Sequence, residues 1–382
     1  MRTLTVSRAS AAFLRRGHPW VRRDRDTRGL DAVRPGEPVT LVDQRGTRLA
    51  SALADPQQAI CARVYHRRPD RRFDPAAAVA RAWDRRAALH AARDTDCYRL
   101  VHGEADFLPA LRVERYAGVL VVVLRAPCML PHCTAVCATL HAHAPRARIV
   151  IREHHDDLRR RTVRTRAWDG AAVDPDARVL GHELGVAVHC TPFAGLATGL
   201  YVDQRATRAA LRAGSAGGRV LNLFAYTGVF SVSLLAAGAA HATDVDLAAP
   251  ALALAADNAR ANGVADRHRP VQAPVATFLA QDRERYDLII VDPPTAAQGG
   301  GGWVVRRDYP DVLSALAPRL APGGRVLAAC NTLGRRFDLH GAVTRALDTA
   351  VPLAAPPIGD DLPQLRGFPE GRPFDLVYVA LP

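Results

Sequence analysis

Hydrophobic and polar positions follow a strand-like pattern over the first part of the chain. Short apolar stretches separated by Gly, Pro and Asp predict a small β-rich unit over residues 1–70. A charged linker at 67–73 precedes a stretch of helical periodicity at 75–90, and extended segments with one further helix follow up to about residue 180. The predicted strands lie at 38–42, 49–53, 60–64, 98–102, 111–114, 119–124 and 148–152, and the further helix at 134–143.

From residue 181 onward, apolar stretches of strand length alternate with helical patterns. This alternation predicts an α/β fold with a mostly parallel sheet and right-handed crossovers. We therefore expect a β-rich domain at 1–70, a central α+β domain at 75–180 and an α/β domain at 181–382. Within the last domain, strands are predicted at 220–224, 242–245, 269–272, 288–292, 325–330 and 374–381, and helices at 229–237, 250–262 and 311–320.

The first strand of the α/β domain breaks into the turn Phe224-Ala225-Tyr226-Thr227-Gly228 and resumes as a helix. Glycine has no Cβ, so such a turn lets a ligand approach the backbone closely. Asp246 ends the second strand, where a carboxylate can accept the hydroxyls of a ribose; its alternative role is to cap the next helix. These positions predict a nucleoside pocket. No Gly-x-Gly-x-x-Gly follows the first strand, which disfavours a dinucleotide.

A polar segment precedes the first strand of this domain. Asp203, Gln204 and Arg205 follow Gly199 closely, and their spacing predicts a helix start capped by Asp203. In the other interpretation, the three side chains contact the carboxylate or the ribose of a bound cofactor.

Two residues at later strand ends suggest the reaction. Asp292 begins the rigid turn Asp292-Pro293-Pro294, and Cys330 ends the next strand, so both should face the same cleft as Gly228. A thiolate that adds to carbon 6 of a pyrimidine makes carbon 5 nucleophilic enough to accept a methyl group. Asp292 would then hydrogen-bond the ring and stabilise charge at nitrogen 3. Alternatively, Cys330 is an inert buried thiol that packs as a small hydrophobe.

Charge and composition narrow the function classes. Of the 382 residues, 48% are hydrophobic and 23% charged, and the net charge of +13 with a pI of about 10.2 favours a polyanionic partner. The chain contains no Lys, which excludes a P-loop lysine and Schiff-base chemistry. No apolar stretch is long enough for a membrane span or signal peptide, so we expect a soluble cytoplasmic protein.

The cysteine residues raise the question of a metal site, and an arginine run raises the question of contacts with phosphates. Seven Cys without a secretory signal predict reduced thiols. Cys128, His132, Cys133 and Cys137 match no common zinc spacing, so we expect no metal. The run of residues 158–166 holds five arginines, and it is either a solvated face or a set of phosphate contacts.

Several motifs together resemble a known family. They comprise Gly17-His18-Pro19-Trp20, Gly103-Glu104-Ala105-Asp106, Arg112-Val113-Glu114-Arg115-Tyr116, the Gly-x-x-x-Asp-Gln-Arg segment ending at Arg205, the turn to Gly228, Asp246, Asp292-Pro293-Pro294, Cys330 and Phe368-Pro369-Glu370-Gly371. They resemble bacterial 23S ribosomal RNA cytosine-C5 methyltransferases with an N-terminal PUA domain, over nearly the whole chain. The resemblance implies a class I methyltransferase fold, S-adenosylmethionine as cofactor, ribosomal RNA as partner and Cys330 as nucleophile.

The resemblance also assigns the candidate residues. Cys330 and Asp292 are the expected catalytic residues, and the expected cofactor-binding residues are Phe224, Ala225, Tyr226, Thr227, Gly228, Asp246, Asp203, Gln204, Arg205, Asp292 and Pro293.

The chain departs from the family pattern at four positions. Thr295 replaces a Lys, Ala273 an acid, Asn331 a Ser and Ala197 a Lys. Two alternatives therefore stay open: N-methylation of a guanine or adenine with Cys330 idle, and an RNA-binding protein without catalytic activity. The sequence also leaves open whether the chain forms a homodimer.

Overall fold

The structure is a computed structural model, and it describes residues 1–154, 163–195, 197–294, 303–331 and 337–382. The chain divides into two compact units. The first unit comprises Met1–Val179, Thr191–Thr198 and Asp360–Gly371, and the second comprises Leu180–Cys190, Gly199–Gly359 and Arg372–Pro382. Each unit is described by itself.

The N-terminal part of the first unit is a small sheet with the strand order β1-β3-β4-β5-β2. Strands β3 and β1 pair in parallel and the other pairs are antiparallel. The three strands predicted here are confirmed, because apolar residues of each strand pack into one core. The elements are β1 Arg2–Thr5, α1 Arg8–Arg15, β2 Trp20–Arg22, β3 Pro38–Val42, β4 Arg48–Ala54 and β5 Ile60–His66.

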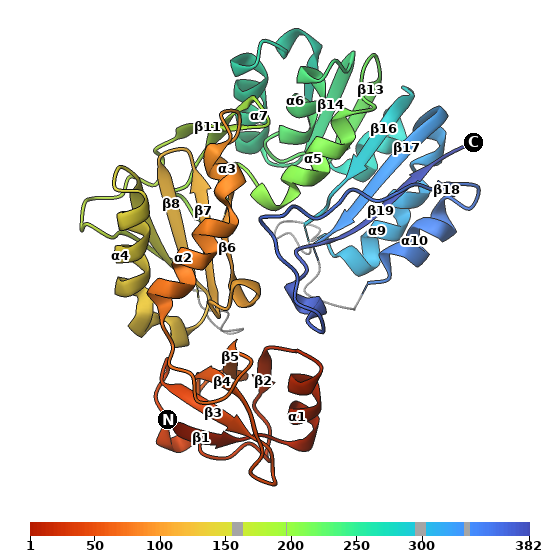
Figure 1. Ribbon diagram of the computed structural model, residues 1–382. Helices are drawn as coiled ribbons and strands as arrows, with labels where there is room; N and C mark the ends of the chain where they lie inside the picture. Colours follow the sequence, from red (N-terminus) through yellow and green to blue (C-terminus); the bar gives the residue numbers. More distant parts are fainter. Residues whose placement is uncertain (155–162, 196, 295–302, 332–336) are drawn as a thin grey trace. The chain divides into compact units, whose positions relative to one another are not determined.

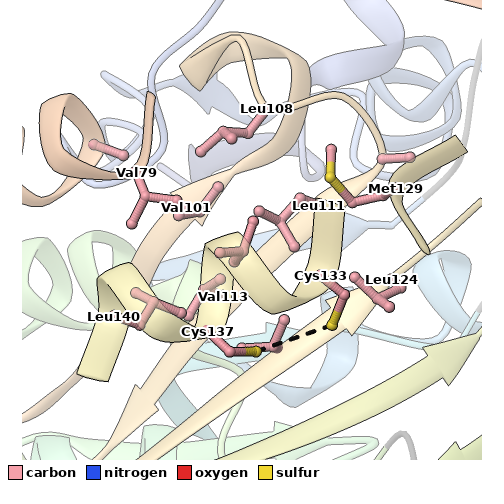
Figure 2. Close-up of a cluster of buried hydrophobic side chains, with 14 of the residues drawn as sticks. Val79, Val101, Leu108, Leu111, Val113, Leu124, Met129, Cys133, Cys137 and Leu140 are labelled. Carbon is pink, nitrogen blue, oxygen red and sulfur yellow. Dashed lines mark hydrogen bonds between the residues drawn. The ribbon is translucent and has the colours of Figure 1, made fainter. Parts of the chain in front are cut away.

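A second sheet of the first unit has the order β10-β9-β8-β7-β6. Helices α2 and α4 share an apolar core with this sheet, and Figure 2 shows part of it, with Val79 of α2 and Leu140 of α4 near Val101 and Val113 of the strands. The elements are α2 Pro75–Arg85, α3 Ala87–Ala91, β6 Cys97–His102, β7 Leu111–Tyr116, β8 Val119–Leu124, α4 Cys133–His143, β9 Arg148–His154 and β10 Val163–Ala167.

The predicted single helix at 75–90 is wrong in one respect, because it is interrupted at Arg86. The guanidinium of Arg86 is buried and donates two hydrogen bonds of 2.8 Å to Asp106, and it also reaches the carbonyls of Arg99 and Asp361. A buried charge needs such partners. The backbone of Arg86 leaves the helical conformation, with ψ at 16°, where α2 ends and α3 begins.

Three of the motifs quoted above meet within the first unit. Glu104 accepts hydrogen bonds from Trp20 Nε1 at 2.8 Å and from Arg63 Nη1 at 2.9 Å. His18 lies 3.2 Å from Glu370, and the ring of Phe368 lies 4.7 Å from that of Trp20. These side chains hold one another, so the motifs have a structural role here.

The second unit contains a sheet with the order β15-β14-β13-β16-β17-β19-β18. Strands β13 to β17 pair in parallel, and β19 is antiparallel to both of its neighbours. Figure 1 shows β13, β16, β17 and β19 side by side, which confirms the predicted mostly parallel α/β fold. The strands of this sheet are β13 Arg219–Leu223, β14 His241–Asp246, β15 His268–Gln272, β16 Tyr286–Val291, β17 Leu320–Cys330, β18 Val351–Pro352 and β19 Asp375–Ala380. Strands β11 Val179–Glu183 and β12 Val186–Cys190 form a separate two-stranded sheet.

Helices α8, α9 and α10 pack against this sheet through one apolar core. The helix predicted at 311–320 is wrong: α9 ends at Ser314, and Leu320 begins β17. Pro310 lies inside α9 and does not precede it. The helices are α5 Arg205–Arg212, α6 Val229–Ala236, α7 Ala249–Ala261, α8 Val275–Gln281, α9 Val305–Ser314 and α10 Leu339–Ala346. Among the described residues, no helix is long and apolar enough to cross a membrane.

Candidate active site

The candidate residues gather at one edge of the sheet in the second unit. Strand β13 lies between β14 and β16, and the chain continues from it first on one side and later on the other. In open α/β sheets a ligand binds at such a switch point, outside the carboxyl ends of the strands. The turn Phe224–Gly228 follows β13, Asp246 ends β14, Asp292 follows β16 and Cys330 ends β17.

The turn after β13 has a strained backbone. Phe224 and Tyr226 have φ of 61° and 52°, a left-handed conformation that costs a non-glycine residue about 1–3 kcal/mol. Two contacts with β14 hold the turn: Ala225 N donates to Val245 O at 3.1 Å, and Tyr226 N donates to Asp246 Oδ2 at 2.8 Å. Strain of this kind is typical of functional sites.

Gly228 ends the turn with φ of 69° and has a packing reason to be glycine. A Cβ atom at this position would overlap Asp244 Oδ2 and lie 2.8 Å from Ala255 Cβ. These atoms belong to β14 and α7, inside the protein. Close packing of the turn on its neighbours, rather than approach of a ligand, therefore accounts for this glycine.

Asp246 uses both carboxylate oxygens on the backbone. Oδ2 accepts from Tyr226 N, and Oδ1 accepts from Ala248 N at 2.9 Å. The N-cap residue of α7 is Ala248, so the alternative role predicted for Asp246, as the cap itself, is wrong. The next side chain, Leu247, is 61% exposed. The end of β14 thus presents a fixed carboxylate beside an apolar surface.

The segment before α5 is tied to the same turn. Gly199 N donates to Tyr226 Oη at 2.9 Å, and Thr227 Oγ1 donates to Gly199 O at 2.5 Å. Asp203 lies in a short 3₁₀ turn, Val202–Gln204. The predicted cap is wrong, because the N-cap residue of α5 is Gln204 and no side chain caps this helix.

Asp292 lies beside this segment. Gln204 Nε2 donates to Asp292 Oδ2 at 3.5 Å, a long hydrogen bond. Burial and, to a smaller extent, the nearby charge of Asp203 raise the pKa of Asp292 to about 7, against smaller opposing effects of Arg208 and Gln204. The carboxyl group can therefore hold or release a proton at neutral pH. The other amide atom, Gln204 Oε1, is buried and has no hydrogen-bond partner in the described part of the chain.

Cys330 is the last residue of β17 and is 1% exposed. Val291 of β16 pairs with Ala328 of β17, so Asp292 and Cys330 leave neighbouring strands just beyond this pair. The thiol belongs to the apolar core cluster of the second unit. Burial fits an inert thiol, whereas the position next to Asp292 fits a nucleophile.

Sequence reasoning missed the ion pair that supports this segment. Arg208 donates to both carboxylate oxygens of Glu183, at 2.5 and 2.7 Å, and to Tyr201 O at 2.9 Å. The charged groups are buried. Arg208 stands among Arg205 and Arg212 in the sequence, and no signal there separates it from a solvent-exposed arginine.

Other candidate positions lie away from the strand ends or outside the described residues. Cys133 and Cys137 are buried in the core of the first unit, with their Sγ atoms 3.9 Å apart (Figure 2). Cavities of about 220 Å³ beside His18 and about 410 Å³ beside α10 do not include the strand-end residues. Arg164 and Arg166 lie exposed on β10, while Arg159–Arg161 and Thr295 fall outside the described residues.

The family models and the curated relatives that this chain matches agree on its family. Residues 99–356 match the family model of S-adenosylmethionine-dependent methyltransferases, and residues 4–67 match that of PUA-like domains. A "Ribosomal RNA large subunit methyltransferase" of Deinococcus radiodurans is 34% identical, covering 90% of this chain and 88% of the relative. A "Ribosomal RNA large subunit methyltransferase I" of Photobacterium profundum is 32% identical over 84% and 83% of the two chains.

Solved structures share the fold. A methyltransferase structure complexed with SAH superposes with a TM-score of 0.87 at 20% identity, and a SAM-dependent methyltransferase structure from Streptococcus mutans with 0.84 at 20% identity. Each covers 100% of both chains. At this identity the likeness shows the fold alone.

Proposed function

Since the chain belongs to the S-adenosylmethionine-dependent methyltransferases, we propose that it methylates carbon 5 of a cytosine in large-subunit ribosomal RNA. One observation carries the proposal: a carboxyl group that titrates near neutral pH and a thiol stand at the ends of two paired strands. The names of the curated relatives and the net charge of +13 support ribosomal RNA as the substrate.

The residues at the ends of β13 and β14 fit S-adenosylmethionine. Asp246 would accept the ribose hydroxyls, and the exposed Leu247 offers an apolar surface to the adenine. The buried and unpartnered Gln204 Oε1 is a suitable acceptor for the ammonium group of the methionyl part. Phe224–Gly228, Asp203, Arg205 and Pro293 complete the proposed surroundings. The bound cofactor supplies an electrophilic methyl group.

The chain's own residues activate the cytosine. The thiolate of Cys330 forms a bond to carbon 6, and the electron pair displaced from the 5,6 double bond moves toward nitrogen 3. Asp292, protonated in part at neutral pH, donates its proton to nitrogen 3 and leaves a ring that is nucleophilic at carbon 5. After methylation, Asp292 recovers its proton from nitrogen 3 and a water molecule takes the proton from carbon 5. The electron pair of that C–H bond re-forms the 5,6 double bond as the thiolate of Cys330 leaves.

The decisive experiment identifies the product and the nucleophile together. Purified protein is incubated with unmodified ribosomal RNA and labelled S-adenosylmethionine, and the methylated nucleoside is identified by mass spectrometry. We expect 5-methylcytidine from the wild type and from Cys190→Ala, a matched control for a buried thiol of the second unit. We expect none from Cys330→Ala, which should still bind the cofactor in calorimetry.

Other outcomes would contradict the proposal in distinct ways. A methylated purine, unaffected by Cys330→Ala, would favour N-methylation with an idle thiol. No product from any RNA, with no binding of the cofactor, would favour an RNA-binding protein without activity.

A further inference from the structure

One hydroxyl group lies between the two strand ends that bear the proposed catalytic residues. Tyr309 Oη on α9 is 2.9 Å from Val291 O and 3.0 Å from Ala329 O. These carbonyls belong to the residues immediately before Asp292 and Cys330. A hydroxyl has one proton to donate, so it serves one carbonyl at a time and keeps both within reach.

The ring that holds this hydroxyl is itself fixed. Tyr309 is fully buried, and its ring stacks on Phe337 with centroids 5.6 Å apart and an interplanar angle of 15°. The ring of Trp303 lies 6.2 Å from that of Tyr309, between centroids, at an interplanar angle of 60°. Because α9 and its aromatic neighbours determine where the ring lies, the hydroxyl holds the ends of β16 and β17 from outside the sheet.

The proposed reaction requires that the ends of β16 and β17 stay at a fixed separation, because both catalytic residues act on one cytosine ring. Nitrogen 3 and carbon 6 lie opposite each other in cytosine. A carboxyl group and a thiol that act on both must stay one ring apart. Past Val291 and Ala328, β16 and β17 have no further paired residues. Cys330 pairs with Asp375 of β19, and Asp292 N donates to Leu223 O of β13, so each strand end is tied to its other neighbour and not to the opposite catalytic residue. A misplacement of about 1 Å can cost on the order of 100-fold in rate.

We propose that Tyr309 is a positioning residue, which fixes the separation of Asp292 and Cys330 through the carbonyls of Val291 and Ala329. The inference rests on the proposed function. Tyr309 Oη is occupied by the two carbonyls and does not act on the substrate itself. Burial raises the pKa of Tyr309 well above its usual value, and the charges of Asp292 and Cys330 raise it further, so the hydroxyl stays a neutral donor.

The variant Tyr309→Phe removes the hydroxyl and keeps the ring. We expect kcat for cytosine methylation to fall about 10- to 100-fold, with the KM for RNA and the Kd for S-adenosylmethionine within about twofold of wild type. RNA containing 5-fluorocytidine has no removable proton at carbon 5, so it should trap the adduct with Cys330. The rate of trapping should fall by the same factor as kcat.

Two further variants separate positioning from general destabilisation. Tyr286→Phe removes a hydroxyl from the same core at the opposite end of β16, and it should leave kcat unchanged whatever it does to the melting temperature. Phe337→Leu keeps the Tyr309 hydroxyl but loosens the ring, and we expect a smaller loss of kcat, about threefold to tenfold. It also tests the inference if Tyr309→Phe fails to fold.

Two results would overturn the inference. Wild-type kcat and trapping rate in Tyr309→Phe would show that the hydroxyl does not position the pair. Equal losses in Tyr286→Phe and Tyr309→Phe would reduce its role to stability. A wild-type protein that forms no 5-methylcytidine would instead remove the proposed function, and the inference with it.

Discussion

Asp292 stands in surroundings that make its ionised form unfavourable. Its pKa of about 7 in the folded protein compares with about 3.9 for an aspartate in an unfolded chain. Between these values the unfolded chain releases the proton while the folded chain keeps it. Stability therefore falls as pH rises from about 4 to about 7 and stays level above that range. The property proposed for catalysis thus lowers stability at neutral pH.

The variant Asp292→Asn should be less active and, at neutral pH, more stable than the wild type. It removes the proton donor, so we expect kcat to fall by about 10²–10⁴. It also removes the unfavourable charge, and its stability advantage over wild type should grow by about 2–3 kcal/mol between pH 4.5 and pH 8. Melting temperatures at the two pH values measure this growth. Asp266→Asn, at an exposed aspartate, serves as the control, and an advantage of equal size at both pH values would contradict the assignment.

Residues at strand ends could be placed from the sequence, but their environments could not. The positions of Asp292 and Cys330 follow from where the apolar strands stop. The raised pKa of Asp292 depends on burial and, to a smaller extent, on the charge of Asp203, which lies almost 90 residues earlier in the chain and reaches it only through the fold. The reason for Gly228 likewise depends on Asp244 and Ala255, which belong to two other elements.

At the scale of elements, the local sequence pattern was sufficient to predict the bounds of an element that is buried along its length. Strands β3 and β8 begin and end at the predicted residues, because every residue of β8 and all but Thr40 of β3 are apolar. The helix predicted at 311–320 is wrong because α9 begins at Val305, includes Pro310 and ends at Ser314. The break at Arg86 was not visible either, since it depends on Asp106 and Asp361 in other parts of the first unit.

The segment that presents Asp203 and Gln204 depends on one buried ion pair. Glu183→Gln leaves the buried Arg208 without a charged partner, and we expect a loss of about 3 kcal/mol and a melting temperature lower by about 6–10 °C. Glu284→Gln breaks the exposed pair with Arg219, whose side chain is 45% exposed, and should cost less than about 1 kcal/mol. Calorimetry of both variants tests the difference, and equal losses would contradict it.

Over the whole molecule, positive charge is divided unequally between the two units. The first unit has 34 Arg against 23 acidic residues, and the second has 17 against 15. The proposed chemistry belongs to the second unit, whereas almost all of the excess charge belongs to the first. This division suggests that the first unit supplies most of the attraction for RNA phosphates, a term that is independent of sequence.

Affinity for RNA should accordingly fall steeply as the salt concentration rises, and arginines of the first unit should account for most of this dependence. With about six phosphates neutralised, Kd should rise by about 10²–10³ between 50 and 200 mM salt. Replacing Arg22, Arg25 and Arg72 by Gln in the first unit should flatten the slope of log Kd against log salt by about 1–2. The same change at Arg269, Arg306 and Arg345 of the second unit should leave it nearly unchanged. All six side chains are exposed, so neither variant should unfold the protein. Filter binding with a ribosomal RNA fragment measures the slopes, and salt-insensitive binding or equal slopes in both variants would contradict this placement of the RNA.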